Sequence, residues 1–262
     1  MPHPTINGEE ILHLFHELMQ PNSPNRVLRL MGQAKLGKSH LLTKVFPTLA
    51  HEQQTACRHA ILDLRSQAQG VPDVLHSACG QLTERGESNF ERYLAEYKAW
   101  RDRPRIETNG IQAFFSKLSF SAHGEDEENR RIIPDLTLAF VSDLRVWSNQ
   151  PVLLLFDAVD NAADATRDWL MDSLLVQLAA LPNVRCVVAG RTLPDAAGGY
   201  AAVCGHYELR PVTEEDAYIH FCQLQKIDLP EQSIRHFAKA FGYLPGLFAE
   251  YTQPFRVGGS RG

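Results

Sequence analysis

The sequence is poor in cysteine, and its five cysteines stand far apart, without a CxxC pair or any other spacing typical of metal ligands. An odd number of scattered thiols predicts reduced, mostly buried side chains rather than a disulfide framework. No apolar run approaches the roughly 20 residues that span a bilayer. The chain also lacks a basic segment followed by an apolar core at its start. We therefore expect a cytoplasmic protein without a membrane partner.

An excess of positive charge is also missing, since the formal net charge is −5 at pH 7. Proteins that bind duplex nucleic acid usually carry a basic excess, so nucleic acid is not an expected partner. The 262 residues, with 44% hydrophobic and 22% charged side chains, are typical of an ordinary globular protein. This length suits one large domain or a domain with a small appendage.

One stretch carries specific chemistry. GQAKLGKSH (32–40) follows an apolar strand candidate, VLRLM (27–31), and opens a helix candidate that we expect to end near Pro47. Its glycines let the backbone fold back so that successive N–H groups point at a phosphate. Lys38 adds charge toward the β- and γ-phosphates, and Ser39 offers a hydroxyl to Mg²⁺. The helix presents its positive N-terminal end to the same phosphates. The predicted nucleotide-binding residues are Gly32, Gln33, Ala34, Lys35, Leu36, Gly37, Lys38, Ser39 and His40.

The second half of the predicted site is an acid at the end of PVLLLFD (151–157). A short, continuous apolar run of this kind indicates a strand buried on both faces of a parallel sheet. In P-loop proteins the acid at this place holds the Mg²⁺ shell, so Asp157 and Ser39 are the candidate metal ligands. The alternative for Asp157 is a helix cap or a solvated acid.

The residue after Asp157 is not a base. Many hydrolytic P-loop proteins have a glutamate there to polarise water, whereas this chain has Ala158. Asp160 is the nearby carboxylate that can align water, with a cap or turn role as the alternative. VVAGR ends another apolar strand in Arg191, which we interpret as a sensor of the γ-phosphate; the alternative is a surface arginine. Asp160 and Arg191 are thus the catalytic candidates, and slow hydrolysis is expected.

Apolar strands and amphipathic helices alternate along the chain. This order predicts an α/β fold with a parallel sheet flanked by helices, followed by a small C-terminal helical subdomain. A last strand is predicted at 207–212, and Thr213 is the expected N-cap of the next helix. A mobile charged loop is predicted around 121–131, where the sequence includes HGEDEENRR. The expected divisions are an N-terminal helix and linker (1–25), a P-loop nucleotide-binding domain (26–206) with a polar insertion (about 84–131), a helical lid (207–255) and a flexible tail (256–262).

Several stretches together resemble the STAND class of signalling P-loop ATPases, which includes NACHT and NB-ARC modules. In order they are GQAKLGKS, LLLFDAVD, VVAGR, YELRPVTEEDA and GYLPG, and DAVDN is similar to the DGxDE motif of NACHT modules. The resemblance implies an ATP/ADP switch whose nucleotide state controls self-association and signalling to protein partners. It also implies that Pro245 packs near the base and ribose, although Pro245 can equally start or kink a helix. Ala158 and Asn161 depart from the motif and remove acids from the water-activating region.

Two alternatives stay open. A DNA-linked AAA+ ATPase of the origin-loading or transposition-helper type shares the loop, and Arg235 could serve as its sensor on the lid. The second is a scaffold that keeps the fold without catalysis and uses an aromatic stripe in the insertion as a docking face. Such a stripe is more often part of the core. It consists of Phe90, Tyr93, Tyr97 and Trp100.

The nucleotide base is indicated by one absence. No guanine-reading NKxD motif follows the last strand, which favours ATP.

Overall fold

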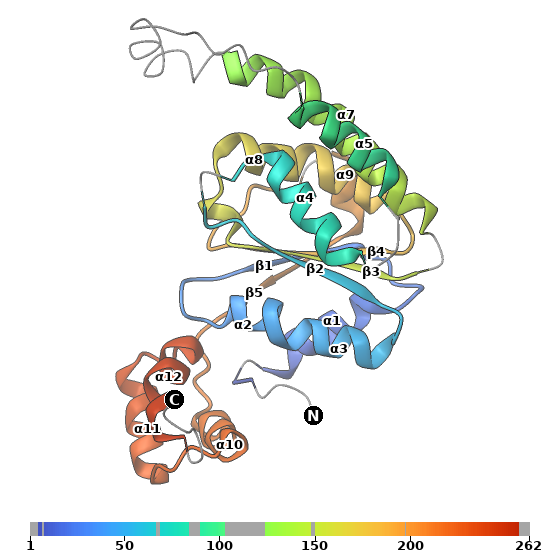
Figure 1. Ribbon diagram of the computed structural model, residues 1–262. Coiled ribbons are helices and arrows are strands. Elements are labelled where there is room, and N and C mark those ends of the chain that lie inside the picture. Colours follow the sequence, from blue (N-terminus) through green and yellow to red (C-terminus); the bar gives the residue numbers. More distant parts are fainter. Residues whose placement is uncertain are drawn as a thin grey trace, which may run out of the picture.

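A five-stranded parallel sheet forms the centre of the protein, with the strand order β2-β3-β4-β1-β5 (Figure 1). The computed structural model describes residues 5–6, 8–66, 69–83, 90–102, 124–147, 150–196 and 198–256, and within 124–131 it describes the backbone alone. The strands are β1 (Val27–Met31), β2 (Arg58–Asp63), β3 (Val152–Asp157), β4 (Val184–Ala189) and β5 (Cys204–Glu208). The sequence-based prediction of a parallel α/β sheet is confirmed.

The strands alternate their side chains between two apolar layers because successive residues of a strand point to opposite faces. On β3, Leu153 and Leu155 pack into one layer, whereas Leu154 and Phe156 pack into the other. Every residue of β3 and β4 is buried. This burial on both faces explains why continuous apolar runs, rather than alternating ones, form these two strands.

One face of the sheet is covered by α1 (Glu9–Met19) and by the helix that follows the glycine-rich loop (Figure 1). That helix runs through α2 (Lys38–His40), a π-helical turn (Leu41–Val45) and α3 (Phe46–Gln53). The expectation that it ends near Pro47 is wrong. Pro47 lies in the first turn of α3, directly after the π-helical turn, where its missing N–H and its ring are tolerated.

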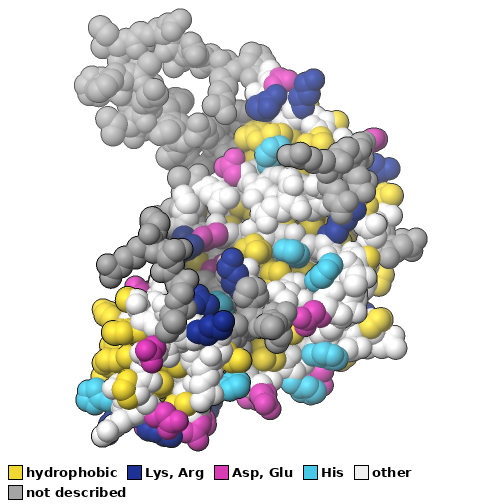
Figure 2. Space-filling model, turned by 60° about the horizontal axis from the view of Figure 1, so that its bottom comes forward, with side chains coloured by type: hydrophobic (Ala, Val, Ile, Leu, Met, Phe, Trp, Pro, Cys, Tyr) yellow, Lys and Arg dark blue, Asp and Glu magenta, His cyan; other side chains and the backbone are white. Residues whose placement is uncertain are grey.

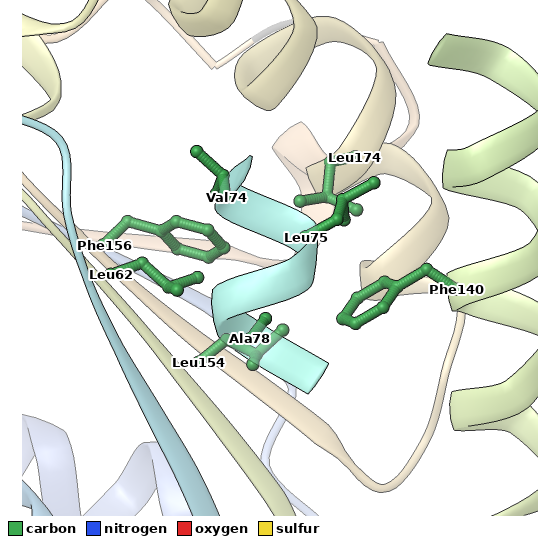
Figure 3. Close-up of a pocket in the computed structure, with 8 residues that line it drawn as sticks. All are labelled: Leu62, Val74, Leu75, Ala78, Phe140, Leu154, Phe156 and Leu174. Carbon is green, nitrogen blue, oxygen red and sulfur yellow. The ribbon is translucent and has the colours of Figure 1, made fainter. Parts of the chain in front are cut away.

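The opposite face is covered by α4 (Val71–Leu82) and by a helix built from α8 (Asp164–Trp169), a π-helical turn (Leu170–Leu174) and α9 (Leu175–Ala179). Apolar side chains from α4, this helix, α7 (Gly124–Val146) and the sheet converge here (Figure 3). The space between them is too small for a water molecule, so this is a packed core and not a ligand site. The lining residues are Leu62, Val74, Leu75, Ala78, Phe140, Leu154, Phe156 and Leu174.

Two helices of the polar insertion region, α5 (Glu91–Arg101) and α7, lie against each other outside this layer (Figure 1). The charged stretch from residue 124 onward is helical, which corrects the loop predicted around 121–131 for its described part. Gly124 begins a helix that continues without a break into the apolar part of α7. Residues 84–89 and 103–123 of the expected insertion lie outside the described residues.

The aromatic stripe of the insertion region belongs to the core. Phe90 and Tyr93 are fully buried, and Tyr97 and Trp100 pack partly buried against the same cluster. Phe90 stacks on Phe140 of α7 with ring centroids 5.4 Å apart. The backbone N–H of Tyr93 donates to the buried carboxylate of Asp143 at 3.0 Å. The stripe is therefore not available as a docking surface.

The chain leaves the sheet earlier than the sequence predicts. Strand β5 covers Cys204–Glu208 rather than 207–212, because its register is set by parallel pairing with Val27–Met31. The C-terminal helical cluster then follows, made of α10 (Glu215–Gln225), α11 (Glu231–Ala240) and α12 (Pro245–Thr252). The N-cap of α10 is Glu214 rather than Thr213. Ile6, from the start of the chain, is buried in the apolar core of this cluster.

The described part of the chain contains no helix long and apolar enough to cross a membrane. All five cysteines are free; Cys204 is half-buried and the other four are buried, as the sequence predicts.

Candidate functional site

The glycine-rich loop joins the carboxyl end of β1 to the N-terminus of α2, and two of its glycines are required by its geometry. Gly32 has φ +144°, and a Cβ there would lie 2.7 Å from the carbonyl oxygen of Leu209. Gly37 has φ +91° and is the N-cap residue of α2. Both conformations are in the region that side-chain-bearing residues avoid. The loop can therefore fold back tightly only with glycine at these two positions.

Lys38 folds over the inside of the loop. Its ammonium donates to the carbonyl oxygens of Gly32 at 2.5 Å and Gln33 at 2.8 Å. Burial lowers the pKa of Lys38, and the attraction of Asp160 and Asp157, which acts in the opposite direction, does not compensate fully. Among the described residues this half-buried cation is hydrogen-bonded to neutral carbonyls alone, and it is suited to receive an anion, because phosphate oxygens supply the charge that carbonyls lack.

The remaining loop residues divide into an anchor and an open surface. Leu36 is buried in the core beneath the loop and fixes its base. The others are wholly or partly exposed, so their backbone is accessible to a ligand. These positions are Gln33, Ala34, Lys35, Ser39 and His40.

Asp157 lies at the carboxyl end of β3, at the same edge of the sheet as the loop. Its carboxylate belongs to a residue that is 4% exposed, accepts the backbone N–H of Ala158 at 2.9 Å, and has no ion-pair partner within the described residues. A buried carboxylate without a direct ion-pair partner is costly. Its oxygen, with the Ser39 hydroxyl and phosphate oxygens, matches the oxygen ligands that Mg²⁺ prefers. The described residues hold no cluster of three or more His, Cys, Asp or Glu side chains, and a phosphate-bound Mg²⁺ requires none.

Strand β4 separates the two halves of the site, because it pairs with β1 on one side and with β3 on the other. The residue that follows Gly190 at the end of β4 is Arg191, which therefore lies between the glycine-rich loop and Asp157. Asp157, Asp160 and Arg191 each influence the pKa of Lys38 electrostatically. The four side chains thus lie together at one edge of the sheet, as the strand order requires.

Asp160, the residue that the sequence suggests for aligning water, is bound by Arg191. Its Oδ2 accepts the Nε of Arg191 at 2.6 Å, and its Oδ1 accepts the backbone N–H of the same residue at 3.0 Å. Asn161 adds a third contact, because its Oδ1 accepts an Nη of Arg191 at 2.9 Å. Burial alone would raise the pKa of Asp160, but the hydrogen bonds from Arg191 outweigh it and hold the pKa below its ordinary value.

The C-terminal helical cluster touches the loop directly, a contact that the sequence does not reveal. Pro245 is buried at the start of α12, and the next residue, Gly246, donates its N–H to the carbonyl of Lys35 at 2.7 Å. Lys35 also forms a 2.5 Å ion pair with Glu250. Pro245 is thus placed one residue from the loop contact. The sequence motif GYLPG marks this segment, but nothing in the sequence indicates that it contacts Lys35.

Arg235, the other cation considered for this site, is engaged elsewhere. It binds Glu215 at 3.1 Å and Asp216 at 2.8 Å, both in the first turn of α10. These contacts lie within the C-terminal helical cluster and satisfy the guanidinium there.

Comparisons with known proteins agree on the fold. No family model matches the chain, and no curated protein sequence matches it. Among solved structures, the Walker-type ATPase paby2304 of Pyrococcus abyssi superposes with a TM-score of 0.51 at 13% identity, over 96% of this chain and 69% of that one. The chain has the α/β fold of a P-loop NTPase.

Two further structures share less. Drosophila ORC bound to AT-rich DNA and Cdc6 matches with a TM-score of 0.41 at 10% identity, over 94% of this chain and 81% of that one. Drosophila ORC bound to GC-rich DNA and Cdc6 gives 0.39 at 10% identity, over 94% and 83%. At these identities the likeness concerns the fold alone and not the STAND class, the ligand or the partners.

Proposed function

We propose that this protein is a regulatory switch that binds ATP or ADP with Mg²⁺ and hydrolyses ATP slowly. The observation that carries the proposal concerns two residues of the site. In the described part of the chain, the half-buried cation Lys38 is hydrogen-bonded to loop carbonyls alone, and the buried carboxylate of Asp157 has no ion-pair partner. A Mg²⁺-bound phosphate group satisfies both at once, because it supplies negative charge to the first and positive charge to the second.

In this proposal the backbone N–H groups of residues 33–39 surround the β-phosphate, and the N-terminus of α2 faces it. Lys38 binds the β- and γ-phosphates, and the Ser39 hydroxyl and Asp157 hold Mg²⁺. Arg191, at the end of β4, is the residue that responds to the γ-phosphate. Pro245, next to the contact between α12 and the loop, is the candidate neighbour of the base and ribose.

Slow hydrolysis follows from the segment after Asp157. Ala158 cannot accept a proton, and Asn161 carries an amide that is itself bound to Arg191. Asp160 is the remaining carboxylate in this segment, and Arg191 occupies both of its oxygens. A general base must accept a proton from water. The one carboxylate of residues 158–161 is therefore ion-paired, and its lowered pKa makes it a weaker base.

The output of the switch is proposed to pass through the C-terminal helical cluster to self-association or to a protein partner, in the manner of the STAND class that the sequence resembles. Support comes from the junction of α12 with the loop. A change in the loop at Lys35 must move or strain its hydrogen bond to Gly246 and its ion pair with Glu250. These two contacts would then couple the nucleotide bound at the loop to the position of α12.

The test begins with mass-spectrometric identification of any nucleotide that copurifies with the protein. Calorimetric titration with ADP and Mg²⁺ follows, on the wild type and on Lys38→Ala. The variant loses charge-assisted hydrogen bonds, each worth about 1.5–3 kcal/mol. Its affinity for ADP should therefore be roughly ten- to hundredfold weaker. Lys44→Ala, an exposed lysine on the same helix, is the matched control and should bind normally. Equal affinity in wild type and Lys38→Ala would refute the assignment of the loop.

The same preparation separates the alternatives. A scaffold binds neither nucleotide, as purified or on addition. A DNA-linked ATPase binds duplex DNA with an affinity that falls steeply with salt. The absence of a nucleic-acid partner stays a prediction that this binding assay tests.

A further inference from the structure

Arg191 is held by what we call the Arg191 clamp, formed by Asp160 and Asn161. The clamp follows β3, whereas Arg191 follows β4, so the contact joins the ends of two neighbouring strands. Three hydrogen bonds of 2.6 to 3.0 Å make it, and two of them involve the guanidinium. This number of directed bonds fixes the orientation of the guanidinium and not only its distance.

The anion of the pair is fixed and the cation is accessible. The side chain of Asp160 is 9% exposed, whereas that of Arg191 is 58% exposed. Ala158, with φ +57°, turns the chain after Asp157 so that Asp160 faces β4. At Gly190 a Cβ would lie 3.0 Å from Oδ1 of Asp160, so a side chain there would crowd the carboxylate. Asp160 is therefore held in a close-fitting position. The more exposed side chain of Arg191 is the one that has room to move toward the solvent.

The segment that carries Arg191 is fastened on its far side as well. Arg29, buried in the middle of β1, donates through one Nη to the carbonyl oxygen of Leu193 at 3.2 Å and also to that of Pro194. These bonds hold the backbone just after Arg191. The backbone is anchored two and three residues after Arg191, and the clamp determines where the side chain of Arg191 lies.

The site around the clamp changes its charge with the number of phosphates. Lys38 attracts Asp160 and Asp157 and is repelled by Arg191, so all of them lie in one electrostatic neighbourhood. In the proposed site, a diphosphate held by the loop and Lys38 would leave the clamp unchanged. A third phosphate beside Lys38 would add negative charge near Asp160 and Asp157, and would compete with Asp160 for the guanidinium.

We propose that Asp160, positioned with Asn161, is a specificity-determining residue that sets the preference of the site between nucleoside diphosphate and triphosphate. It retains Arg191 when a diphosphate is bound and releases it when a terminal phosphate is present. This inference rests on the proposed nucleotide site. A triphosphate must break the clamp before it gains Arg191, so its affinity is lowered by the clamp, whereas that of a diphosphate is not.

The inference is tested by the ratio of two affinities, measured by calorimetry with Mg²⁺ for ADP and for AMP-PNP, a triphosphate analogue that is not hydrolysed. Asp160→Asn keeps the shape of the side chain and weakens its hold on Arg191, so AMP-PNP should bind about five- to tenfold more tightly while ADP changes by less than about twofold. Arg191→Gln should weaken AMP-PNP about tenfold and leave ADP unchanged. Asn161→Ala, which removes one contact, should shift the ratio in the same direction as Asp160→Asn by a smaller factor.

Asp164→Asn is the matched control, because Asp164 is an exposed acid nearby that pairs with Arg167 at 2.8 Å and not with Arg191. It should leave both affinities unchanged, and circular dichroism should show all variants folded. A merely structural role for Asp160 would weaken both ligands together and leave the ratio at its wild-type value, which would overturn the inference, as would a ratio that Arg191→Gln does not change. Failure of the wild type to bind either nucleotide would instead refute the proposed function, and this inference with it.

Discussion

The backbone N–H of Gly246 donates a 2.7 Å hydrogen bond to the carbonyl oxygen of Lys35, and so joins the first turn of α12 to the glycine-rich loop. The approach is close: a Cβ at Gly246 would lie 2.8 Å from that oxygen and 3.1 Å from its carbon. Lys35 is itself in the left-handed region, with φ +66°. The exposed ion pair between Lys35 and Glu250 adds little energy by itself. The backbone contact is therefore the part of this junction that determines its geometry.

Gly246→Ala should disrupt the junction. The added methyl group must push the loop and α12 apart or strain both, and we expect the free energy of unfolding to fall by about 1–3 kcal/mol. Urea denaturation measures this change. ADP affinity should fall in parallel, because the loop backbone is displaced. Figure 2 shows the face turned toward the viewer, on which several dark blue Lys and Arg side chains gather between the lower left and the centre of the view.

Gly80→Ala is the control for this substitution. Gly80 lies within α4, and a Cβ added there would meet no atom within 4 Å outside the backbone of its own helix. Alanine should stabilise that helix by about 0.5–1 kcal/mol. If the two variants proved equally stable, α12 would not contact the loop in solution.

Gly32→Ala should be more damaging than its small size suggests. It combines a φ of +144° with a contact of 2.7 Å to the carbonyl oxygen of Leu209, and we expect a loss of about 2–4 kcal/mol. Thermal and urea unfolding measure it. Gly198→Ala has the positive φ without the contact, since its nearest atom is 3.9 Å away, and should cost only about 1 kcal/mol. Equal losses would show that backbone conformation alone matters at Gly32.

Stability should decline on the alkaline side because of the buried thiols. Burial raises the pKa of Cys57 and Cys222 to about 11 and that of Cys186 to about 12, above the ordinary value of 9.0 for a thiol. The unfolded chain therefore ionises first, so this contribution is complete below about pH 9 and is lost as pH rises toward 11–12. Urea unfolding from about pH 7 to about pH 10.5 should show the decline.

A reagent specific for thiolates gives an independent reading of the same thiols. At about pH 8 the native protein should react far more slowly than the unfolded chain, in which all five cysteines are accessible. Fast native labelling of Cys186, which lies within β4, would contradict its burial.

Leu154→Ala should create a cavity in the apolar layer under α4. The side chain is fully buried among Leu62, Phe140 and Phe156, and the expected loss is about 2–5 kcal/mol. Leu94→Ala, on the exposed side of α5, should change stability by no more than about 0.5 kcal/mol. Similar effects at both positions would contradict the packing of this layer.

Much of the fold could be predicted because the sheet is buried on both faces. Continuous apolar runs such as VLLLFD are short and bounded by Pro and Asp, which favours a strand buried on both faces over a helix and makes β3 predictable from the sequence. Strand β5 is misplaced by the sequence pattern because it lies at an edge, where its limits depend on its partner β1 and not on its own composition. The same applies to Pro47, whose effect depends on the π-helical turn before it.

The candidate site is predictable where local spacing determines it, and not where the strand order does. The positions of Gly32 and Gly37 follow from the turn that they form. The pairing of Asp160 with Arg191 depends on β3 and β4 being neighbours, which no local pattern specifies. The contact of Lys35 with Gly246 depends on how the C-terminal helices pack against the finished sheet.

The position of β4 between β1 and β3 also has a consequence for folding during synthesis on the ribosome. A nascent chain that has emerged as far as Asp157 already contains the glycine-rich loop and the metal-ligand candidate, yet the strand that spaces them, Val184–Ala189, has still to be synthesised. The two halves of the proposed site therefore reach their final spacing only after β4 has been inserted between β1 and β3. If the proposed function is right, nucleotide binding stabilises the folded chain only from that stage onward.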